Sequence, residues 1–311
     1  MSKPVLRIGC TQYLNTEAIL SHKVSMDGFD YEPVRAMSID ECTLKTLNGE
    51  YDVGESSLAT FMKVAETNHD LVALPIFSRK FLHQYQFCAR DSTIEHPADL
   101  SGKKVAIPQF WITAGIWHRW LFENYYQLDP KQITWCPLQR DRIKDVPYPA
   151  RYVIDWSYLG KSAPGLLRDG EIDCFLYARK LDDDKGIRIL YPDVKTEEMS
   201  FHREMNMVPI THVIVVNSHL LTDHPTLAKD LLFLFEASKQ HGLKELGNFV
   251  SLYLPFGDLH LEETISFLGE QWNGYGWSNN RETLRSFYTA ACEQGFLTRQ
   301  RDFESYFAHV D

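Results

Sequence analysis

The chain has 311 residues, more than a single hydrophobic core usually supports, so its length predicts two domains. Hydrophobic residues make up 44% and charged residues 24% of the sequence, which is typical of a chain that is globular throughout. The net charge is -10 and no cluster of Lys and Arg occurs, which argues against a nucleic-acid partner.

Neither a membrane span nor a secretion signal is predicted. No run of roughly 18 apolar residues occurs, and the apolar run at residues 5–8 is shorter than the core of a signal peptide. The six cysteines lack CxxC or Cys/His metal spacing, so we expect buried free thiols and no metal site. These features predict a cytoplasmic protein in a reducing compartment.

The first ninety residues alternate between strand and helix signals. Strand patterns occupy residues 5–9, 29–36, 71–77 and 84–89. The capping box that begins at Ser38 predicts a helix that ends at Gly49. Residues 49–57 then predict a turn, a short strand and a polar loop, followed by a helix from about Leu58. This order is typical of βαβ units.

Helices dominate the last third of the sequence. Apolar residues at helical spacing predict a long helix from Thr226 to about Gln240. Residues 259–311 predict further helices broken at residues 273–276, and we expect their aromatic side chains to pack rather than bind. For Tyr275 the alternative is a place at the edge of a ligand cleft. These helices are also a candidate interface for a homo-oligomer.

Two segments of the chain echo each other. Residues 8–19 (IGCTQYLNTEAI) and 105–116 (VAIPQFWITAGI) each predict a strand, a polar turn and the start of a helix. The aligned pairs are Gln12 with Gln109, Tyr13 with Phe110 and Thr16 with Thr113. Residues 49–52 (GEYD) and 170–173 (GEID) form a second pair in the same order. We interpret the echoes as two lobes built on one plan; the alternative is chance, because such turns recur in any doubly wound sheet.

Hydroxyl groups stand at the predicted strand ends and helix starts. In such lobes the free backbone N–H groups and the helix dipole favour a carboxylate or a phosphate. Thr16 and Thr113 supply hydroxyls at two helix starts, and Ser56 and Ser57 follow a strand. We take them as candidate ligand contacts, with simple helix capping as the alternative.

Seven segments, in order along nearly the whole chain, resemble the 4,5-dihydroxyphthalate decarboxylase family. They are residues 52–58, 74–83, 97–105, 113–119, 170–179, 208–213 and 275–295. The most specific motifs are Ser-Arg-x-Phe-x-His, which ends at His83, and Pro-Ile-x-His, which ends at His212. The Pro-x-Asp-Leu-x-Gly-Lys motif at residues 97–103 is less specific, because it is widespread in type II periplasmic-binding folds.

The resemblance implies an α/β protein with the two-lobed type II periplasmic-binding-protein-like fold, whose ligand cleft lies between lobes joined by two crossing strands. We place residues 1–86 and 213–311, with the C-terminal helices, in lobe 1 and residues 87–212 in lobe 2. The resemblance also implies a carboxy-lyase of aromatic compound catabolism. Such an enzyme removes one carboxylate from a dihydroxylated aromatic diacid without a metal or organic cofactor.

The implied reaction needs an acid, a base and a group that holds a carboxylate. Decarboxylation of an electron-rich phenol is easiest when the ring carbon that bears the carboxylate is protonated first. The hydroxyl para to that carbon then donates electrons, and the resulting dienone loses carbon dioxide. Histidine suits the proton transfers because its pKa is about 6.5, and arginine suits the carboxylate because its guanidinium is a planar fork.

We therefore predict His83 and His212 as the acid/base pair near the crossing strands, with Glu55 orienting a histidine or accepting a phenol proton. Arg79 is predicted to hold the carboxylate, and Arg179 from the opposite lobe is the second candidate. Further substrate-binding candidates are Gln12, Ser56, Ser57, Gln109, Thr113 and Trp117, the last by stacking on the ring. The structural alternatives are hydrogen-bonded hinge histidines, a solvated loop carboxylate and core packing of the tryptophan.

Two positions depart from the family pattern. Leu82 stands where we expect a basic residue before His83, and Thr211 precedes His212. One anion contact is missing, so a monoacid or a diacid with different spacing stays an alternative to 4,5-dihydroxyphthalate. Two other functions also stay open: a dehydratase-type enzyme on the same fold, and a cytoplasmic solute-binding protein for a small aromatic anion.

Overall fold

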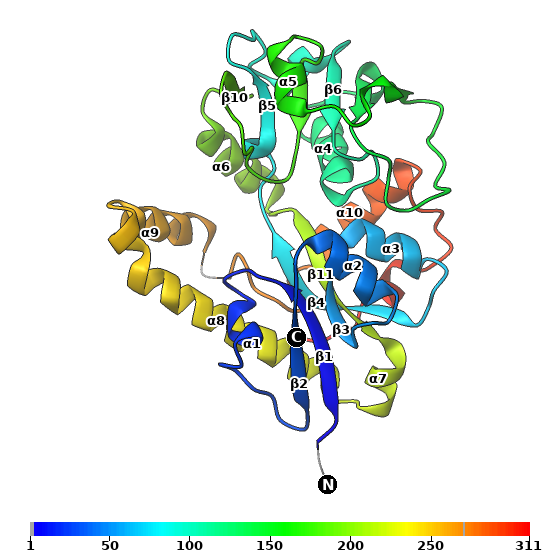
Figure 1. Cartoon of the computed structure of the whole chain (residues 1–311), viewed down its shortest axis with the longest axis vertical. Helices are drawn as coiled ribbons and strands as arrows, with labels where there is room; N and C mark the ends of the chain where they lie inside the picture. Colours follow the sequence, from blue (N-terminus) through cyan, green and yellow to red (C-terminus); the bar gives the residue numbers. More distant parts are fainter. Residues whose placement is uncertain (1–2, 270) are drawn as a thin grey trace. The chain divides into compact units, whose positions relative to one another are not determined.

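The computed structural model describes residues 3–269 and 271–311, and the described chain divides into two compact units (Figure 1). Unit 1 consists of the first segment, which ends at Arg79, together with Ile210–Arg285 and Arg299–Asp311. Unit 2 consists of Lys80–Pro209 and Ser286–Thr298. Among the described residues, no helix is both long and apolar enough to cross a membrane.

Unit 1 contains a five-stranded mixed sheet. Its strands lie in the order β2 (Asp30–Ala36), β1 (Val5–Thr11), β3 (Val53–Ser57), β11 (Ile210–Asn217) and β4 (Leu71–Arg79). β1 pairs parallel with β2 and β3, whereas β11 pairs antiparallel with β3 and β4. A strand from late in the chain is thus inserted between two early ones.

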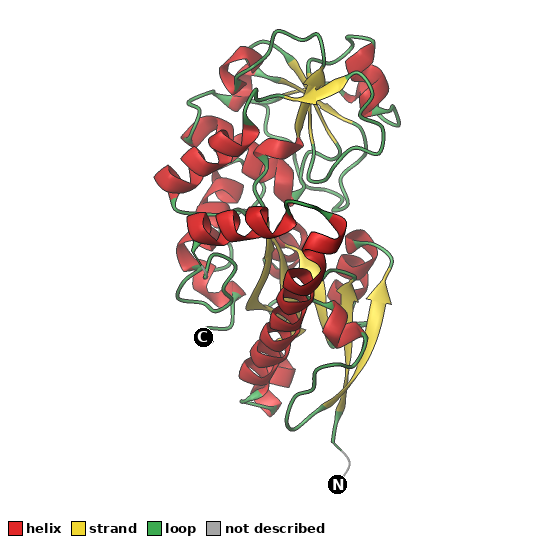
Figure 2. Ribbon diagram, turned by 90° about the vertical axis from the view of Figure 1, so that its left-hand side faces the viewer, coloured by secondary structure: helices red, strands yellow, loops and turns green. Residues whose placement is uncertain are grey.

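Helices supply the rest of the core of unit 1. They are α1 (Glu17–Leu20), α2 (Ile39–Leu47), α3 (Leu58–Ala65), α7 (Ser218–Asp223), α8 (Leu227–Tyr253) and α9 (Gly257–Leu268). Figure 2 shows the long helix α8 running alongside the strands of unit 1. Its buried residues Leu231 and Phe235 belong to one hydrophobic cluster with Ile8, Val53 and Leu74 of the sheet. Burial of this apolar face holds the helix on the sheet.

Unit 2 contains a six-stranded sheet. Its strands lie in the order β10 (Ile187–Ile189), β5 (Gln86–Ala89), β9 (Cys174–Leu176), β6 (Lys104–Ile107), β7 (Thr134–Pro137) and β8 (Val153–Ile154). The strands from β9 to β8 are parallel, and β5 is antiparallel to both of its neighbours. The helices are α4 (Thr113–Asn124), α5 (Ala163–Arg168) and α6 (Val194–Met205), and α10 (Arg281–Glu293) begins in unit 1 and ends in unit 2.

The two units follow one strand plan, as the sequence echoes predict. In unit 1 the neighbours in order are β2, β1, β3 and the antiparallel β11; in unit 2 they are β7, β6, β9 and the antiparallel β5. The echoed glycines Gly49 and Gly170 have φ angles of +75° and +68°, and each follows a helix and precedes the third of these strands. The positive φ explains why glycine stands at both turns.

Most local predictions in the first ninety residues are confirmed, and one is wrong. Strands occur at Val5–Thr11, Asp30–Ala36 and Leu71–Arg79, and a helix follows Ser38, whose hydroxyl accepts a hydrogen bond from Glu41 N–H at 3.2 Å. Residues 55–57 are not a polar loop, because β3 continues through Ser57 and all three residues are buried. Pairing with β11, which sequence periodicity does not reveal, extends the strand.

The boundaries between the units differ from the predicted ones. The chain leaves unit 1 after Arg79 and returns at Ile210, whereas we predicted residues 86 and 213. β4 and β11 pair as far as Arg79 and Ile210, so both strands belong to unit 1 up to that point. Residues 286–298 group with unit 2 rather than with the first lobe, because Phe287 packs on Trp117 with ring centroids 5.3 Å apart.

Candidate active site

A small pocket that combines apolar walls with a few polar groups opens at one end of the sheet of unit 1. Its lining comes from the loop after β1, from β3, β4, β11 and α8, and from the segment before α10: Asn15, Thr16, Glu55, Ile76, Phe77, Ser78, His212, Val213, Ile214, Phe235 and Tyr275. The enclosed volume is about 10 Å³, which is room for about one water molecule. A larger ligand therefore reaches into this pocket with one group only.

Glu55 and His212 meet in this pocket. The Nδ1 atom of His212 lies 2.8 Å from Oε1 of Glu55. His212 is paired with Ser57 across the β3–β11 ladder, and Glu55 is two residues from Ser57, so both side chains lie on the same face of the sheet. The sequence predicts each residue as a candidate, and the strand register brings them together.

Glu55 is buried but well supplied with hydrogen bonds. Glu55 is 2% exposed, and its Oε2 atom accepts hydrogen bonds from the backbone N–H of Thr11 at 3.2 Å and from the Thr11 hydroxyl. These contacts offset the loss of water around the carboxylate. The alternative of a solvated loop carboxylate is therefore wrong.

His212 lines the pocket and is partly exposed. Its side chain is 18% exposed, and Nε2 has no hydrogen-bond partner within the described parts of the chain. A histidine held at Nδ1 by a buried carboxylate has a defined ring orientation, and its Nε2 atom is available for proton transfer. The pair therefore has the geometry of a general acid or base.

Two thiols lie near Glu55. Burial raises the pKa of the Cys10 thiol well above its usual range and that of Cys42 to about 12, with a smaller contribution from the Glu55 carboxylate in both cases. Both thiols stay protonated at neutral pH and are poor nucleophiles. Five of the six cysteines are buried free thiols, as predicted, and Cys292 is half-buried. In the described part of the chain, no three His, Cys, Asp or Glu side chains are grouped to hold a metal ion.

Arg79 is engaged by the main chain of unit 1. One terminal nitrogen of its guanidinium donates to Trp272 O at 3.1 Å, and the other donates to Gly274 O at 2.9 Å. The guanidinium carbon lies 5.7 Å from the ring centroid of Phe77. Each terminal nitrogen keeps a second N–H group and the buried Nε has no hydrogen-bond partner among the described residues, but Arg79 does not line the pocket.

Tyr275 lines the pocket, although we expected it to pack rather than bind. Its hydroxyl oxygen accepts a hydrogen bond from Asn15 Nδ2 at 3.2 Å. Burial raises the pKa of the Tyr275 phenol to about 12, so the hydroxyl is protonated at neutral pH. The sequence signals at this position are the flanking glycines Gly274 and Gly276 and the start of the family-like segment 275–295. The contact with Asn15 has no such signal, because the two residues are 260 positions apart.

His83 belongs to unit 2 and is enclosed by aromatic rings. It is 1% exposed, and its ring centroid lies 6.1 Å from Tyr126, 5.5 Å from Tyr191 and 5.2 Å from Phe201. Neither ring nitrogen has a hydrogen-bond partner in the described structure. Burial, with a smaller contribution from His118, lowers the pKa of His83 to about 3, so the ring is neutral at neutral pH. His83 belongs to unit 2 and His212 to unit 1, and their role as an acid/base pair stays a prediction.

The remaining candidates of unit 1 have local partners. Gln12 is exposed and links Arg35 at 2.7 Å with Glu17 at 3.0 Å. Ser56 is fully buried and donates to Ser57 O at 3.3 Å, and the backbone N–H of Ser57 donates to the Thr43 hydroxyl. None of these three candidate side chains lines the pocket that contains His212.

The candidates of unit 2 occupy different environments. Trp117 is 1% exposed and packs edge-on against Trp120 with ring centroids 5.4 Å apart, which confirms the alternative of core packing. Thr113 is the buried first residue of α4, and Gln109 is half-buried in the loop that follows β6. Arg179 is exposed and donates to the hydroxyl of Tyr177.

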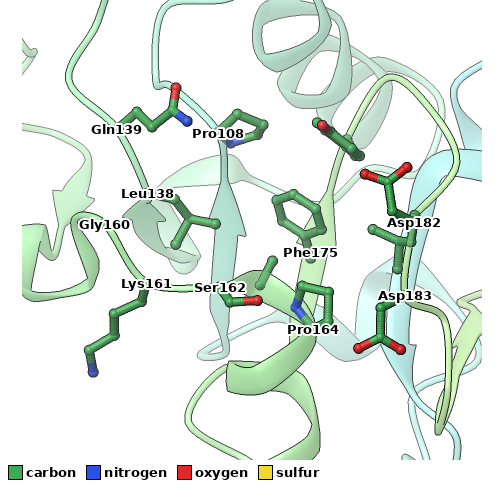
Figure 3. Close-up of a pocket in the computed structure, with 13 residues that line it drawn as sticks. Pro108, Leu138, Gln139, Gly160, Lys161, Ser162, Pro164, Phe175, Asp182 and Asp183 are labelled. Carbon is green, nitrogen blue, oxygen red and sulfur yellow. The ribbon is translucent and has the colours of Figure 1, made fainter.

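Unit 2 has a cavity of its own, about 380 Å³ in volume (Figure 3). It lies where the parallel strands β6, β7 and β9 end, and it is lined by Pro108, Leu138, Gln139, Gly160, Lys161, Ser162, Ala163, Pro164, Phe175, Tyr177, Leu181, Asp182 and Asp183. Carboxyl ends of parallel strands are the usual ligand position in open α/β sheets. Its one cationic side chain, Lys161, is paired with Glu171 at 2.8 Å, and Asp183 is paired with Arg168 at 2.9 Å.

Comparisons with known proteins agree with the fold. No protein-family model matches the chain. The aliphatic sulphonate-binding protein SsuA of Escherichia coli is similar with a TM-score of 0.58 and 15% identity, covering 100% of this chain and 94% of that one. A Candida albicans protein described as having the generic periplasmic binding protein fold is similar with a TM-score of 0.56 and 11% identity, covering 99% of this chain and 97% of that one. The chain therefore has the periplasmic-binding-protein fold, as predicted.

Sequence comparison finds relatives among named enzymes. The 4,5-dihydroxyphthalate decarboxylase of Comamonas testosteroni is 27% identical over 316 aligned positions, which cover 96% of this chain and 95% of that protein. The protein of the same name from Pseudomonas putida is 27% identical over 188 positions, which cover 58% of this chain and 72% of that protein. The chain is thus similar over nearly its whole length to an enzyme that carries the decarboxylase name.

Proposed function

We propose that this protein is a carboxy-lyase that decarboxylates a hydroxylated aromatic carboxylic acid such as 4,5-dihydroxyphthalate. The observation that carries the proposal is the Glu55–His212 pair, whose Nδ1 and Oε1 atoms lie 2.8 Å apart and whose two residues line one pocket. The similarity to the Comamonas testosteroni enzyme over 96% of the chain supports the same chemistry.

In the proposed reaction His212 gives a proton from Nε2 to the ring carbon that carries the carboxylate. The para hydroxyl donates electrons and loses its proton to solvent, which leaves a dienone. The bond between ring and carboxylate then breaks, carbon dioxide leaves, and the bonding electrons restore the aromatic ring as a phenolate, which takes a proton from solvent to give the phenol. Glu55 accepts a hydrogen bond from Nδ1 throughout, so it stabilises the charged imidazole that gives the proton.

The pocket has room for about one water molecule, so a benzene ring does not fit inside it. In the proposal the ring lies at the mouth of the pocket, beside Nε2 of His212, and one carboxylate or hydroxyl group enters. His83 enters the proposal only as the second acid/base candidate, because its ring is enclosed within unit 2.

The test is carbon dioxide release from 4,5-dihydroxyphthalate by purified protein, compared with His212→Gln and His83→Gln variants. We expect release by the wild type and a loss of roughly 10² to 10⁴ in kcat for His212→Gln, the usual contribution of a general acid. His260→Gln, at a side chain that is 71% exposed, is the matched control and keeps wild-type activity. Absence of release by the wild type from this acid and from related hydroxybenzoates would falsify the proposal.

A solute-binding role is the second candidate, because the fold is similar to that of the sulphonate-binding protein SsuA. Saturable binding of the aromatic acid without any product supports this role. Product analysis by mass spectrometry also separates a dehydratase, since loss of water lowers the mass by about 18 Da and loss of carbon dioxide by about 44 Da.

A further inference from the structure

We propose that Tyr275 binds an anionic oxygen of the ligand, and that Arg79 and Lys239 are positioning residues that hold residues 271–276, the Tyr275 loop. The inference rests on the proposed function for the ligand class, an aromatic carboxylate. It replaces the predicted arginine clamp with a neutral hydroxyl donor, and it gives the arginine a different task.

Two cationic side chains, half-buried Arg79 and buried Lys239, hold three consecutive carbonyl groups of this loop. Arg79 donates to Trp272 O at 3.1 Å and to Gly274 O at 2.9 Å, and Lys239 Nζ donates to Asn273 O at 3.0 Å. The ammonium group of Lys239 also lies 4.0 Å from the ring centroid of Tyr275. Hydrogen bonds from charged donors are stronger than neutral ones, so this arrangement fixes the backbone on both sides of Asn273.

Neutral groups complete the attachment of the loop. Gly276 N–H donates to Pro75 O at 2.9 Å, which ties the loop to β4. The side-chain amide of Asn280, a residue that is 2% exposed, donates to Gly274 O at 3.1 Å and to Gly276 O at 2.7 Å. The residues on either side of Tyr275 therefore each have main-chain hydrogen bonds, and its side chain has a defined direction.

The hydroxyl hydrogen of Tyr275 has no hydrogen-bond acceptor among the described residues. Asn15 Nδ2 donates to the hydroxyl oxygen at 3.2 Å, and within the described residues no acceptor takes the hydroxyl hydrogen in return. The hydroxyl lies in the same pocket as His212 and Glu55. A protonated phenol beside a general acid is suited to donate to a carboxylate or phenolate oxygen of the ligand.

Arg79 acts through the loop in this scheme, because it donates to two loop carbonyl groups and does not line the pocket. Burial lowers the pKa of Arg79 to about 10, so the side chain keeps its charge at neutral pH. Among the described residues, no carboxylate forms an ion pair with it, whereas Lys239 is paired with Glu236 at 2.8 Å. The loop carbonyls are thus the acceptors that compensate the guanidinium at its two terminal nitrogens, whereas the buried Nε has no acceptor among the described residues.

The ligand part is tested with Tyr275→Phe, which removes the hydroxyl and keeps the ring. We expect KM for 4,5-dihydroxyphthalate, and Kd for phthalate by calorimetry, to rise about tenfold to hundredfold, with little change in kcat. Tyr253→Phe, at a residue that is 82% exposed, is the matched control and stays at wild-type values. Unchanged KM and Kd in Tyr275→Phe overturn the assignment.

The positioning part is tested with Arg79→Met and, as a second variant, Lys239→Met. We expect faster hydrogen exchange of the amides in residues 271–276 and a higher KM. Arg7→Met, which also removes a bond to a main-chain carbonyl, Glu50 O at 3.0 Å, leaves that exchange unchanged. Wild-type exchange in both loop variants overturns the positioning role.

These outcomes are distinguishable from failure of the proposed function. A wild-type protein that binds the aromatic acids and releases no carbon dioxide overturns the decarboxylase proposal alone, and the Kd comparison still decides the role of Tyr275. A wild-type protein that binds none of them overturns the ligand part, whereas hydrogen exchange still decides the role of Arg79.

Discussion

The backbone of Leu14 lies directly against Gly242 of α8, so that a Cβ atom at position 242 would be only 2.2 Å from Leu14 O. This contact places the segment after β1, which supplies Asn15 and Thr16 to the pocket, on the long helix. Backbone atoms cannot move aside as a flexible side chain can, and glycine is therefore required at this close approach.

Gly242→Ala is expected to destabilise unit 1 by about 1 to 3 kcal/mol and to raise KM, because the added methyl group displaces the segment that carries Asn15. Urea denaturation and kinetics measure the two effects. The control is Gly247→Ala on the same helix, where no atom lies within 4 Å of the new Cβ. That change is expected to stabilise the protein by up to about 1 kcal/mol. Equal stability of both variants would show that Leu14 yields without cost.

Glu55→Gln is expected to lower kcat about tenfold to hundredfold while leaving the fold intact. The amide keeps the size of the side chain but loses the charge that holds Nδ1 of His212. Steady-state kinetics with 4,5-dihydroxyphthalate measure the change, and circular dichroism verifies the fold. Glu262→Gln on α9, at an exposed carboxylate, is expected to behave as wild type. Full activity of Glu55→Gln would argue against a role for the carboxylate.

His83→Phe is expected to remove part of the acid sensitivity of the protein. The pKa of His83 is about 3 in the folded state and 6.5 in the reference state, so its contribution to stability is complete above pH 6.5 and is lost as the pH falls. At pH 5 this loss is about 2 kcal/mol for one histidine. Phenylalanine does not titrate, and the aromatic surroundings suit its ring.

The measurement is urea denaturation of wild type and His83→Phe at pH 7 and at pH 5. The variant is expected to lose about 2 kcal/mol less than wild type between the two values. His118, with a pKa lowered by burial to about 4, and Glu198, with a pKa raised by burial to about 7, are present in both proteins and cancel. The same difference in His69→Phe, at an exposed residue, would contradict the explanation.

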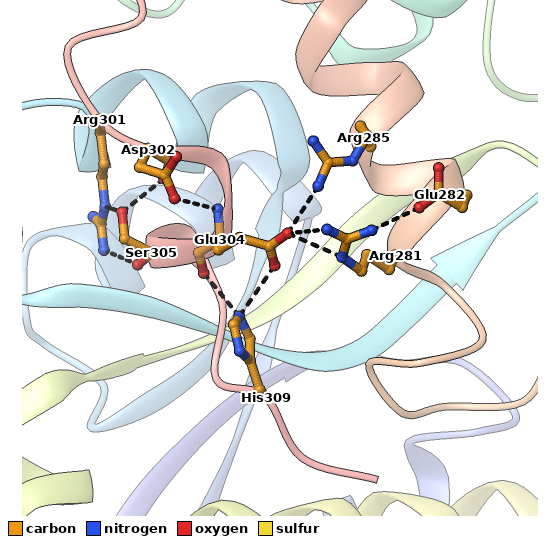
Figure 4. Close-up of polar contacts among 8 residues, drawn as sticks. All are labelled: Arg281, Glu282, Arg285, Arg301, Asp302, Glu304, Ser305 and His309. Atoms are coloured by element: carbon orange, nitrogen blue, oxygen red, sulfur yellow. Dashed lines mark hydrogen bonds and ion pairs between the residues drawn. The ribbon is translucent and has the colours of Figure 1, made fainter.

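Arg301→Met is expected to destabilise unit 1 by about 3 kcal/mol, since it leaves buried carbonyl groups without donors. The guanidinium of Arg301, a residue that is 3% exposed, donates to Ala65 O at 2.8 Å and to Leu71 O at 3.0 Å, which attaches the C-terminal segment to α3 and β4. Figure 4 shows Arg301 with the neighbouring ion pairs of Glu304.

The matched control is Arg285→Met. Arg285 pairs with Glu304 at 2.8 Å, but its side chain is 41% exposed, and such surface ion pairs contribute roughly 1 kcal/mol or less. Thermal and urea unfolding of both variants measure whether Arg301→Met loses more stability than Arg285→Met. A larger loss in Arg285→Met than in Arg301→Met would reverse our ranking of the two contacts.

Several residues of the candidate site can be predicted individually from the sequence. Glu55 and His212 stand out because polar residues follow strand-forming segments, and the family motif ends at His212. The sequence leaves two roles open for Trp117, stacking on a ligand or core packing. Its burial against Trp120 and Phe287 in the structure decides for core packing. The contact of Tyr275 with Asn15 is not recognisable from the sequence, because the two residues are 260 positions apart.

The local elements and the repeated plan are predictable from the sequence, because apolar periodicity, capping residues and turn glycines such as Gly49 and Gly170 act over a few positions. The place of β11 between β3 and β4 is visible in the folded protein alone, and it makes Glu55 a buried strand residue beside His212 instead of a loop residue. Ladder hydrogen bonds join residues far apart in the chain, and no local pattern specifies which strand becomes the neighbour.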